Sequence, residues 1–231
     1  MSFPLLYFAS AAKSLGWTPN NLTGLLGLYE TNGPYCFADA GKATPCANGT
    51  GIYTWVGRAG PDLVQATAAN RATFTTGTNR AVYDGGDNYG LWPTGSPAGL
   101  FSFHRFKTST LGYHNIYDNT SLVGVMLWID NFGKLEPDAG AAVWTNQAAS
   151  TDGAWHTVFV WRSLTEATRL WRDGTEITPD VPRTPQTVPA NLDLFSRGGA
   201  SGFDGSISAF GFASALPSTA QLANLQAYLT A

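Results

Sequence analysis

Apolar and β-branched side chains dominate the segment from Trp155 to Arg162. Such side chains pack well on a pleated strand and poorly against the preceding turn of a helix. The two-residue period of a strand puts Trp155, Thr157, Phe159 and Trp161 on one face and His156, Val158, Val160 and Arg162 on the other. Both faces carry apolar bulk, so the pattern predicts a strand inside a sheet that is covered on both sides.

A second strand, 169–172, follows and ends at the dipeptide Asp173-Gly174. The next residues, 175–177, are again strand-like. Asp-Gly between two such runs is typical of a tight hairpin turn, because both turn positions take positive φ.

Apolar runs separated by turn residues continue along most of the chain, which is the spacing of antiparallel sheets. Further strands are predicted at 25–30, 80–83, 89–92, 100–106, 113–117, 122–129, 141–144, 191–195 and 203–212. The cluster Asp84-Gly85-Gly86-Asp87-Asn88 predicts a hairpin that joins strands 80–83 and 89–92.

The two ends of the chain differ from this pattern. Ser218-Thr219-Ala220-Gln221 forms a capping box, and Leu222, Leu225 and Leu229 then fall on one helical face, so a short C-terminal helix is expected. Residues 1–23 form an apolar N-terminal arm before a single domain at 24–231. An arm this apolar is expected to dock either on its own domain or on a neighbour in an assembly.

Composition narrows the function classes. Only 13% of the 231 residues are charged and the formal net charge is −3, with scattered Lys and Arg, which argues against nucleic-acid binding. No apolar run is long enough to span a bilayer. The N-terminus lacks the basic residues of a signal peptide, so a protein working outside the cell is expected to be trimmed or to leave by another route, such as phage release by lysis.

Cys36 and Cys46 lie in one loop rich in Gly, Pro and Asn. A disulfide there would close a short loop and contribute roughly 2–3 kcal/mol. Two reduced thiols in a protein assembled inside a reducing cell are the alternative, and the sequence leaves both open.

Five segments in order resemble the laminin-G-like branch of the concanavalin A-like lectin/glucanase superfamily. They are the strand 25–30, the passage from Trp55 to Phe74, the passage from Val82 to Tyr89, the core from Trp155 to Gly174, and the strand from Phe203 with its following helix. The resemblance implies an all-β jelly-roll sandwich of two antiparallel sheets. The family includes lectins, glucanases, adhesion modules and phage accessory proteins, so it does not settle function.

Enzymatic members of that superfamily place three acidic residues at alternating positions of one strand. This chain has no such triplet: Glu136 and Asp138 are two apart, but Pro137 between them indicates a turn. We therefore expect no catalytic residues and no enzymatic activity.

The resemblance also implies that calcium is possible, with Asp84, Asp87 and Asn88 as candidate ligands. The alternative is that these residues serve turn geometry. Gly57 and Ser208 stand where relatives often carry Asp, which weakens the metal case. No other cofactor is expected.

Sugar binding needs aromatic platforms with polar neighbours. The candidates are Trp92, Trp144 and Trp171 with Arg172, each near a predicted loop, and burial in the core or in an interface is the alternative for each.

The sequence hypothesis is a non-catalytic structural or binding module. The main form is a phage virion accessory protein, for capsid decoration or tail adhesion, that joins an oligomeric assembly through its arm and contacts glycans. The alternatives are a lectin-like carbohydrate-binding module of a secreted protein and, third, a glucanase. If the protein is a phage accessory protein or a secreted module, it is expected in the virion or outside the cell.

Overall fold

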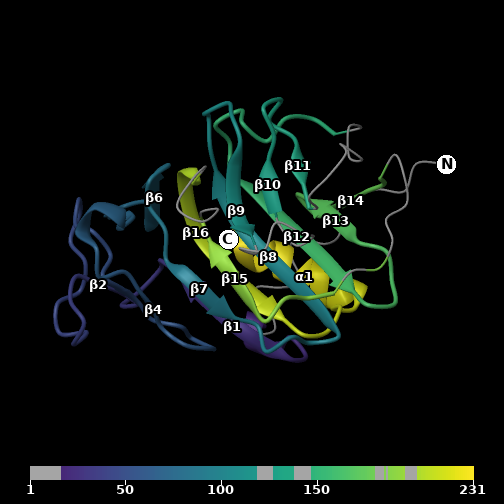
Figure 1. Cartoon of the computed structure of the whole chain (residues 1–231), viewed down its shortest axis with the longest axis horizontal. Coiled ribbons are helices and arrows are strands. Elements are labelled where there is room, and N and C mark those ends of the chain that lie inside the picture. The colour runs from purple at the N-terminus through teal and green to yellow at the C-terminus, as the bar shows by residue number, and fades with distance from the viewer. Residues whose placement is uncertain (1–16, 119–126, 138–146, 180–184, 186, 196–201) are drawn as a thin grey trace.

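Two large antiparallel sheets and one small sheet form the protein in a computed structural model (Figure 1). The structure describes residues 17–118, 127–137, 147–179, 185, 187–195 and 202–231. The eight-stranded sheet has the order β14 (Thr175–Ile177), β13 (Arg169–Arg172), β12 (His156–Ser163), β8 (Gly99–Lys107), β16 (Asp204–Ala213), β6 (Arg80–Asp84) and β5 (Thr73–Thr75), with β1 (Leu25–Glu30) also paired to β16.

The second large sheet has five strands and the small sheet has three. The five-stranded order is β11 (Leu135–Glu136), β10 (Leu127–Ile129), β9 (His114–Asp118), β15 (Asn191–Leu194) and β7 (Gly90–Pro93). The small sheet consists of β2 (Cys36–Phe37), β3 (Thr54–Trp55) and β4 (Leu63–Val64), and two short 3-10 helices are η3 (Pro19–Asn21) and η4 (Ala68–Asn70).

The main core lies between the two large sheets. Its buried side chains come from both: Val158, Val160 and Phe210 from the larger sheet, Ile116 and Leu192 from the smaller. An all-β antiparallel sandwich is therefore confirmed. The jelly-roll topology implied by the family resemblance stays a prediction.

A second apolar cluster covers the other face of the eight-stranded sheet. There Phe159 and Trp161 of β12 pack in one cluster with Leu225 and Leu229 of α1 (Thr219–Thr230), which lies behind β8 and β12 in Figure 1. All eight residues of β12 are buried, so the predicted strand with two covered faces is confirmed. The capping box at Ser218 is confirmed as well, with its hydroxyl accepting from the Gln221 amide at 3.3 Å.

The Asp173-Gly174 turn joins β13 to β14 as predicted, with φ of 51° and 81°. The other predicted hairpin is wrong. Strand β6 pairs with β5 and β16 in the larger sheet, whereas β7 pairs with β15 in the smaller. The Asp84–Asn88 segment therefore carries the chain from one sheet to the other, and a local turn motif does not specify which of these two connections the chain makes.

The described part of the N-terminal arm docks on its own domain. Leu22 is buried in the cluster with α1, and the Trp17 ring packs edge-on against Tyr228 with centroids 6.3 Å apart. The Gln221 side chain also donates to the Asn21 carbonyl at 3.1 Å. The predicted strand 141–144, the first part of 122–129 and residues 1–16 of the arm lie outside the described residues. Within the part of the chain that the structure describes, we find no helix with the length and apolarity to span a membrane.

Candidate functional site

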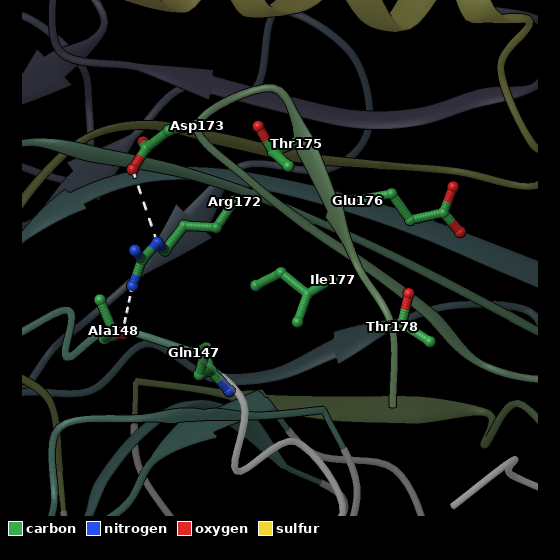
Figure 2. A pocket seen from close by; sticks show the side chains of 8 residues that line it. All are labelled: Gln147, Ala148, Arg172, Asp173, Thr175, Glu176, Ile177 and Thr178. Carbon is green, nitrogen blue, oxygen red and sulfur yellow. Dashed lines mark hydrogen bonds and ion pairs between the residues drawn. The ribbon is translucent and has the colours of Figure 1, made fainter. Parts of the chain in front are cut away.

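A polar pocket of about 490 Å³ lies beside β14, the terminal strand of the larger sheet (Figure 2). We call it the β14 pocket. It is lined by Gln147, Ala148, Arg172, Asp173, Thr175, Glu176, Ile177 and Thr178. The β13–β14 hairpin therefore supplies six of these residues, and the segment that precedes β12 supplies the other two.

Arg172 ties the two sides of the pocket together. Its guanidinium donates to the Ala148 carbonyl and lies 3.3 Å from the Ser150 hydroxyl. Its Nε also lies 3.7 Å from an Asp173 carboxylate oxygen. Figure 2 shows the guanidinium between Asp173 and Ala148, so the hairpin and the 147–150 segment are held by one cation.

Asp173 is held in turn by His156, which lies between two carboxylates. Its Nδ1 is 2.8 Å from Asp173 Oδ2 and its Nε2 is 3.0 Å from Asp152 Oδ1. Asp173 also accepts from the Thr157 amide at 2.9 Å. Because ionised carboxylates only accept hydrogen bonds, this arrangement favours the imidazolium form, in which both ring nitrogens donate.

The pKa shifts of His156 and of its two carboxylate partners agree with a charged imidazolium ring. The hydrogen bond to Asp173 is the largest cause of a raised His156 pKa, and burial opposes it. The Asp173 pKa is lowered: burial, which raises it, is outweighed by the bonds from His156 and the Thr157 amide. The Ala154 amide and His156 lower the Asp152 pKa. His156 thus links the Asp-Gly turn before β12 to the Asp-Gly turn of the hairpin. This structural role explains why a histidine stands at the start of β12 and why each turn carries an aspartate.

Gln147 connects the pocket to the smaller sheet. Its side-chain amide donates to the Leu135 carbonyl at 2.7 Å, and its oxygen accepts from the Leu135 amide at 3.2 Å. Gln147 therefore bonds to the backbone of β11, the terminal strand of the five-stranded sheet. The β14 pocket lies at the side of the sandwich where terminal strands of both large sheets are near.

The pocket combines donors and acceptors with one apolar side chain. Figure 2 shows Ile177 pointing between Arg172 and Gln147, and Ile177 also packs against the main core. Hydroxyl groups come from Thr175 and Thr178, both exposed, and the Glu176 carboxylate is paired with Arg169 at 2.7 Å. Such a surface suits a neutral polar ligand that presents both hydroxyls and C–H groups.

Two of the three tryptophans proposed as sugar platforms, Trp92 and Trp171, are not available as platforms. Trp92 is 1% exposed, stacks on Phe212 with centroids 4.4 Å apart and donates to the Tyr29 hydroxyl at 2.8 Å. Trp171 is buried and the Arg169 guanidinium lies over its ring. Both expectations are corrected, because the core of a sandwich takes up large rings. Trp144 lies outside the described residues. Of the members of this set that the structure describes, Arg172 lines the pocket.

The candidate calcium ligands take part in turn hydrogen bonds. An Asp84 carboxylate oxygen accepts from the Gly86 amide at 2.9 Å, and Asp87 accepts from the Asp84 amide at 3.1 Å. Asn88 accepts from the Gln65 side chain through two oxygens. Among the described residues no three His, Cys, Asp or Glu side chains gather in a way that suits a metal ion. These observations favour the turn role over a calcium site.

Cys36 and Cys46 are free thiols in the structure. The Cys46 amide donates to the Cys36 carbonyl at 2.9 Å, so the two residues are neighbours across the loop. Burial raises the pKa of the Cys36 thiol above its usual range and raises that of Cys46 to about 11.

Because thiolates are the reactive form, we expect both cysteines to react slowly with Ellman's reagent at pH 7 in the folded protein. Two thiols should titrate rapidly once the protein is unfolded in guanidinium chloride without reductant. A count of zero in the unfolded protein would demonstrate a disulfide and contradict this prediction.

Most of the pocket was not predicted from the sequence. No recognised motif includes four of its lining residues, which are Gln147, Thr175, Glu176 and Thr178. Thr175 and Glu176 lie in a correctly predicted strand close in sequence to the candidate Arg172, and this closeness was the one signal that could have identified them. The approach of Gln147 to the hairpin depends on long-range packing.

Comparison with known proteins shows similarity of fold. No family model and no curated protein sequence matches the chain. Among solved structures, Trypanosoma rangeli sialidase, in complex with a difluoro-KDN, matches with a TM-score of 0.60 and 13% identity over 88% of this chain. Domain 4 of AbnA, an extracellular arabinanase from Geobacillus stearothermophilus, solved in complex with arabinotriose, matches with a TM-score of 0.55 and 15% identity over 87% of this chain.

The two matches differ in how much of the other protein they include. The chain spans 98% of the arabinanase domain but only 32% of the sialidase chain. The chain therefore has the fold of a whole domain of one carbohydrate-active protein and of about a third of another. The comparisons give the phage-particle hypothesis no support, and the concanavalin A-like family assignment stays a prediction.

Proposed function

We propose that this protein is a non-catalytic, lectin-like carbohydrate-binding module and that the β14 pocket holds part of its glycan. The observation that carries the proposal is the lining of the pocket, where a guanidinium, a side-chain amide and two threonine hydroxyls surround the apolar Ile177. A sugar ring presents hydroxyls at its edge and C–H groups on its faces, and this lining is complementary to both.

The fold supports the same proposal. Domain 4 of the arabinanase has a similar fold over nearly its whole length and was solved with arabinotriose bound. The sialidase match covers about a third of that enzyme, so its hydrolytic chemistry is not part of the proposal. We also propose that the sandwich is a jelly roll of the concanavalin A-like kind.

The charges around the pocket favour a neutral sugar. One guanidinium, that of Arg172, faces two carboxylates, those of Asp173 and Glu176. Arg172 is already close to Asp173, and Arg169 holds Glu176 through two hydrogen bonds of 2.7 Å. Each of these carboxylates is thus already paired with a cation, so a carboxylated sugar would have to compete with Asp173 for Arg172, whereas a neutral sugar would not.

The test is titration calorimetry with three soluble probes: arabinotriose, cellotriose and 3′-sialyllactose. We expect at least one neutral probe to bind. Thr175→Val removes one exposed hydroxyl without changing the side-chain shape, and it should weaken that binding several-fold, since a hydrogen bond contributes about 0.5–1.5 kcal/mol. Arg172→Met should weaken it by at least about tenfold, since a charged donor contributes more.

Thr76→Val is the matched control, because Thr76 is an exposed threonine in the β5–β6 turn that does not line the pocket. It should bind like the unaltered protein. Urea unfolding of each variant checks that the fold is intact. If none of the three probes binds, or if Thr175→Val and Arg172→Met bind as tightly as Thr76→Val, the proposal is wrong.

A further inference from the structure

A pair of stacked aromatic rings lies at one end of the β9–β10 ladder, outside the β14 pocket. The Tyr113 and Trp128 rings have centroids 4.9 Å apart and planes 13° from parallel. Tyr113 is 50% exposed although Trp128 lies against one of its faces. About half of the Tyr113 side chain is therefore open to a ligand even with Trp128 stacked on it.

Strand register places both rings on the outer face of the five-stranded sheet. Leu127 and Ile129, on either side of Trp128, belong to the core between the sheets, so Trp128 points away from it. Asn115 is the register partner of Trp128, and Tyr113 is two residues earlier in the chain. Residues two apart share a face of a strand, which agrees with the observed stacking.

The backbone on both sides of the pair is held in place. The Thr110 carbonyl accepts from His114 Nε2 at 3.1 Å, which closes the loop before β9. On the other side, one Asp130 carboxylate oxygen accepts from the Phe132 and Lys134 amides, both at 2.8 Å. The Tyr113 ring is thus supported on one face by Trp128, and the loop that carries it is closed by the bond between His114 and Thr110.

We propose that the Tyr113–Trp128 pair is a stacking platform for the C–H face of a sugar ring, forming a second glycan contact. The face of an aromatic ring is electron-rich, and the C–H groups of a sugar face carry partial positive charge, so the two surfaces attract. A ring that is supported on one face and half exposed offers this contact at little entropic cost. The inference rests on the proposed function in that the ligand is a glycan.

The size of the apolar surface favours a sugar over a protein partner. Beside Tyr113, the exposed large apolar side chains at this end are Leu111 and Phe132. The remaining two among the described residues, Val64 and Leu164, lie on other segments of the chain. A stable protein interface involves about 20–30 residues on each side, far more than this platform provides.

The experiment compares three substitutions at one position, using calorimetry with arabinotriose, cellotriose and 3′-sialyllactose. Tyr113→Phe keeps the ring and should bind within about twofold of the unaltered protein. Tyr113→Leu keeps an apolar side chain without a ring and should lose roughly tenfold in affinity, which is about 1.4 kcal/mol. Tyr113→Ala should lose a similar amount, because neither variant offers an aromatic face to the C–H groups of the sugar. Leu164→Ala, an exposed apolar truncation elsewhere, is the control and should bind normally.

The outcomes separate this inference from the proposed function. Normal binding by Tyr113→Leu, with weakened binding by Arg172→Met, would overturn the platform and leave the pocket standing. The reverse pattern would support the platform and remove the pocket. Binding of no probe by the unaltered protein would overturn both. A change of sedimentation coefficient in Tyr113→Leu without loss of sugar binding would identify a protein contact and overturn the platform.

Discussion

The variant His104→Phe should resist acid unfolding far better than the unaltered protein. His104 lies on β8, fully buried, with rings of Tyr117 and Phe210 stacked on it at centroid distances of 5.5 and 6.2 Å. Neither ring nitrogen has a hydrogen-bond partner in the described structure. Burial lowers the His104 pKa from 6.5 to about 3, because a charged imidazolium has no solvation there.

The sign of the pH dependence follows from linkage. Between pH 6.5 and about 3 the unfolded chain binds a proton at His104 and the folded protein does not, so acid favours unfolding in this window. Each pH unit costs about 1.4 kcal/mol, or on the order of 4 kcal/mol across the window. The His104→Phe variant has no proton to bind at this position, so it does not lose this stability in acid. At pH 7 we expect it to be about 1–3 kcal/mol more stable, since two unsatisfied nitrogens are removed.

Urea unfolding between pH 3 and pH 8 measures the effect, with His156→Gln as the control. The His156 pKa is raised, so its contribution is fully present below pH 6.5 and is lost as pH rises through the folded pKa. The stability lost in His156→Gln should therefore be larger at pH 6 than at pH 8, the opposite trend. Parallel stability curves for His104→Phe and the unaltered protein would contradict the prediction.

The variant Arg58→Met should lose about 3 kcal/mol of unfolding free energy. Arg58 pairs with Glu30, whose side chain is 1% exposed. The Tyr228 hydroxyl donates to the other Glu30 oxygen at 2.6 Å, so this pair joins β1, the 57–60 loop and α1. Removing the cation leaves a buried carboxylate without its counter-charge, which typically costs 3–5 kcal/mol. We expect the lower end because 24% of the Arg58 side chain is exposed.

A double-mutant cycle separates the charge effect from lost packing. The double variant Glu30→Met, Arg58→Met buries no charge and should recover most of the stability lost in Arg58→Met. Urea unfolding at pH 7 of the unaltered protein, both single variants and the double variant measures the coupling. If the losses of the two single variants simply add in the double variant, the pair does not carry the stability assigned to it.

Local chemistry made some elements predictable. The β12 strand, the Asp173-Gly174 turn and the capped helix α1 each depend on residues within a few positions of one another. Arg172, a candidate named from the sequence, lines the β14 pocket because it adjoins that turn, and its role in binding stays a prediction. The place of His156 on a strand covered on both sides was also expected, although its two carboxylate partners were not.

Other features depend on residues far apart in the chain. Trp92 was expected near a loop surface, but β7 pairs with β15, and Phe212 of β16 covers the ring. The hairpin predicted at Asp84–Asn88 was also wrong because of long-range pairing, since β6 pairs with β5 and β16 and not with β7. The Tyr113–Trp128 stack required the register of β9 against β10.

The sequence by itself determined that this protein is an antiparallel β structure with a C-terminal helix, since side-chain period, turn residues and capping are local properties. The tertiary structure decided which tryptophans are buried, which strands are neighbours and where a polar pocket forms. Burial and pocket shape are properties of surfaces that meet only after distant segments pack, so no single stretch of the chain encodes them.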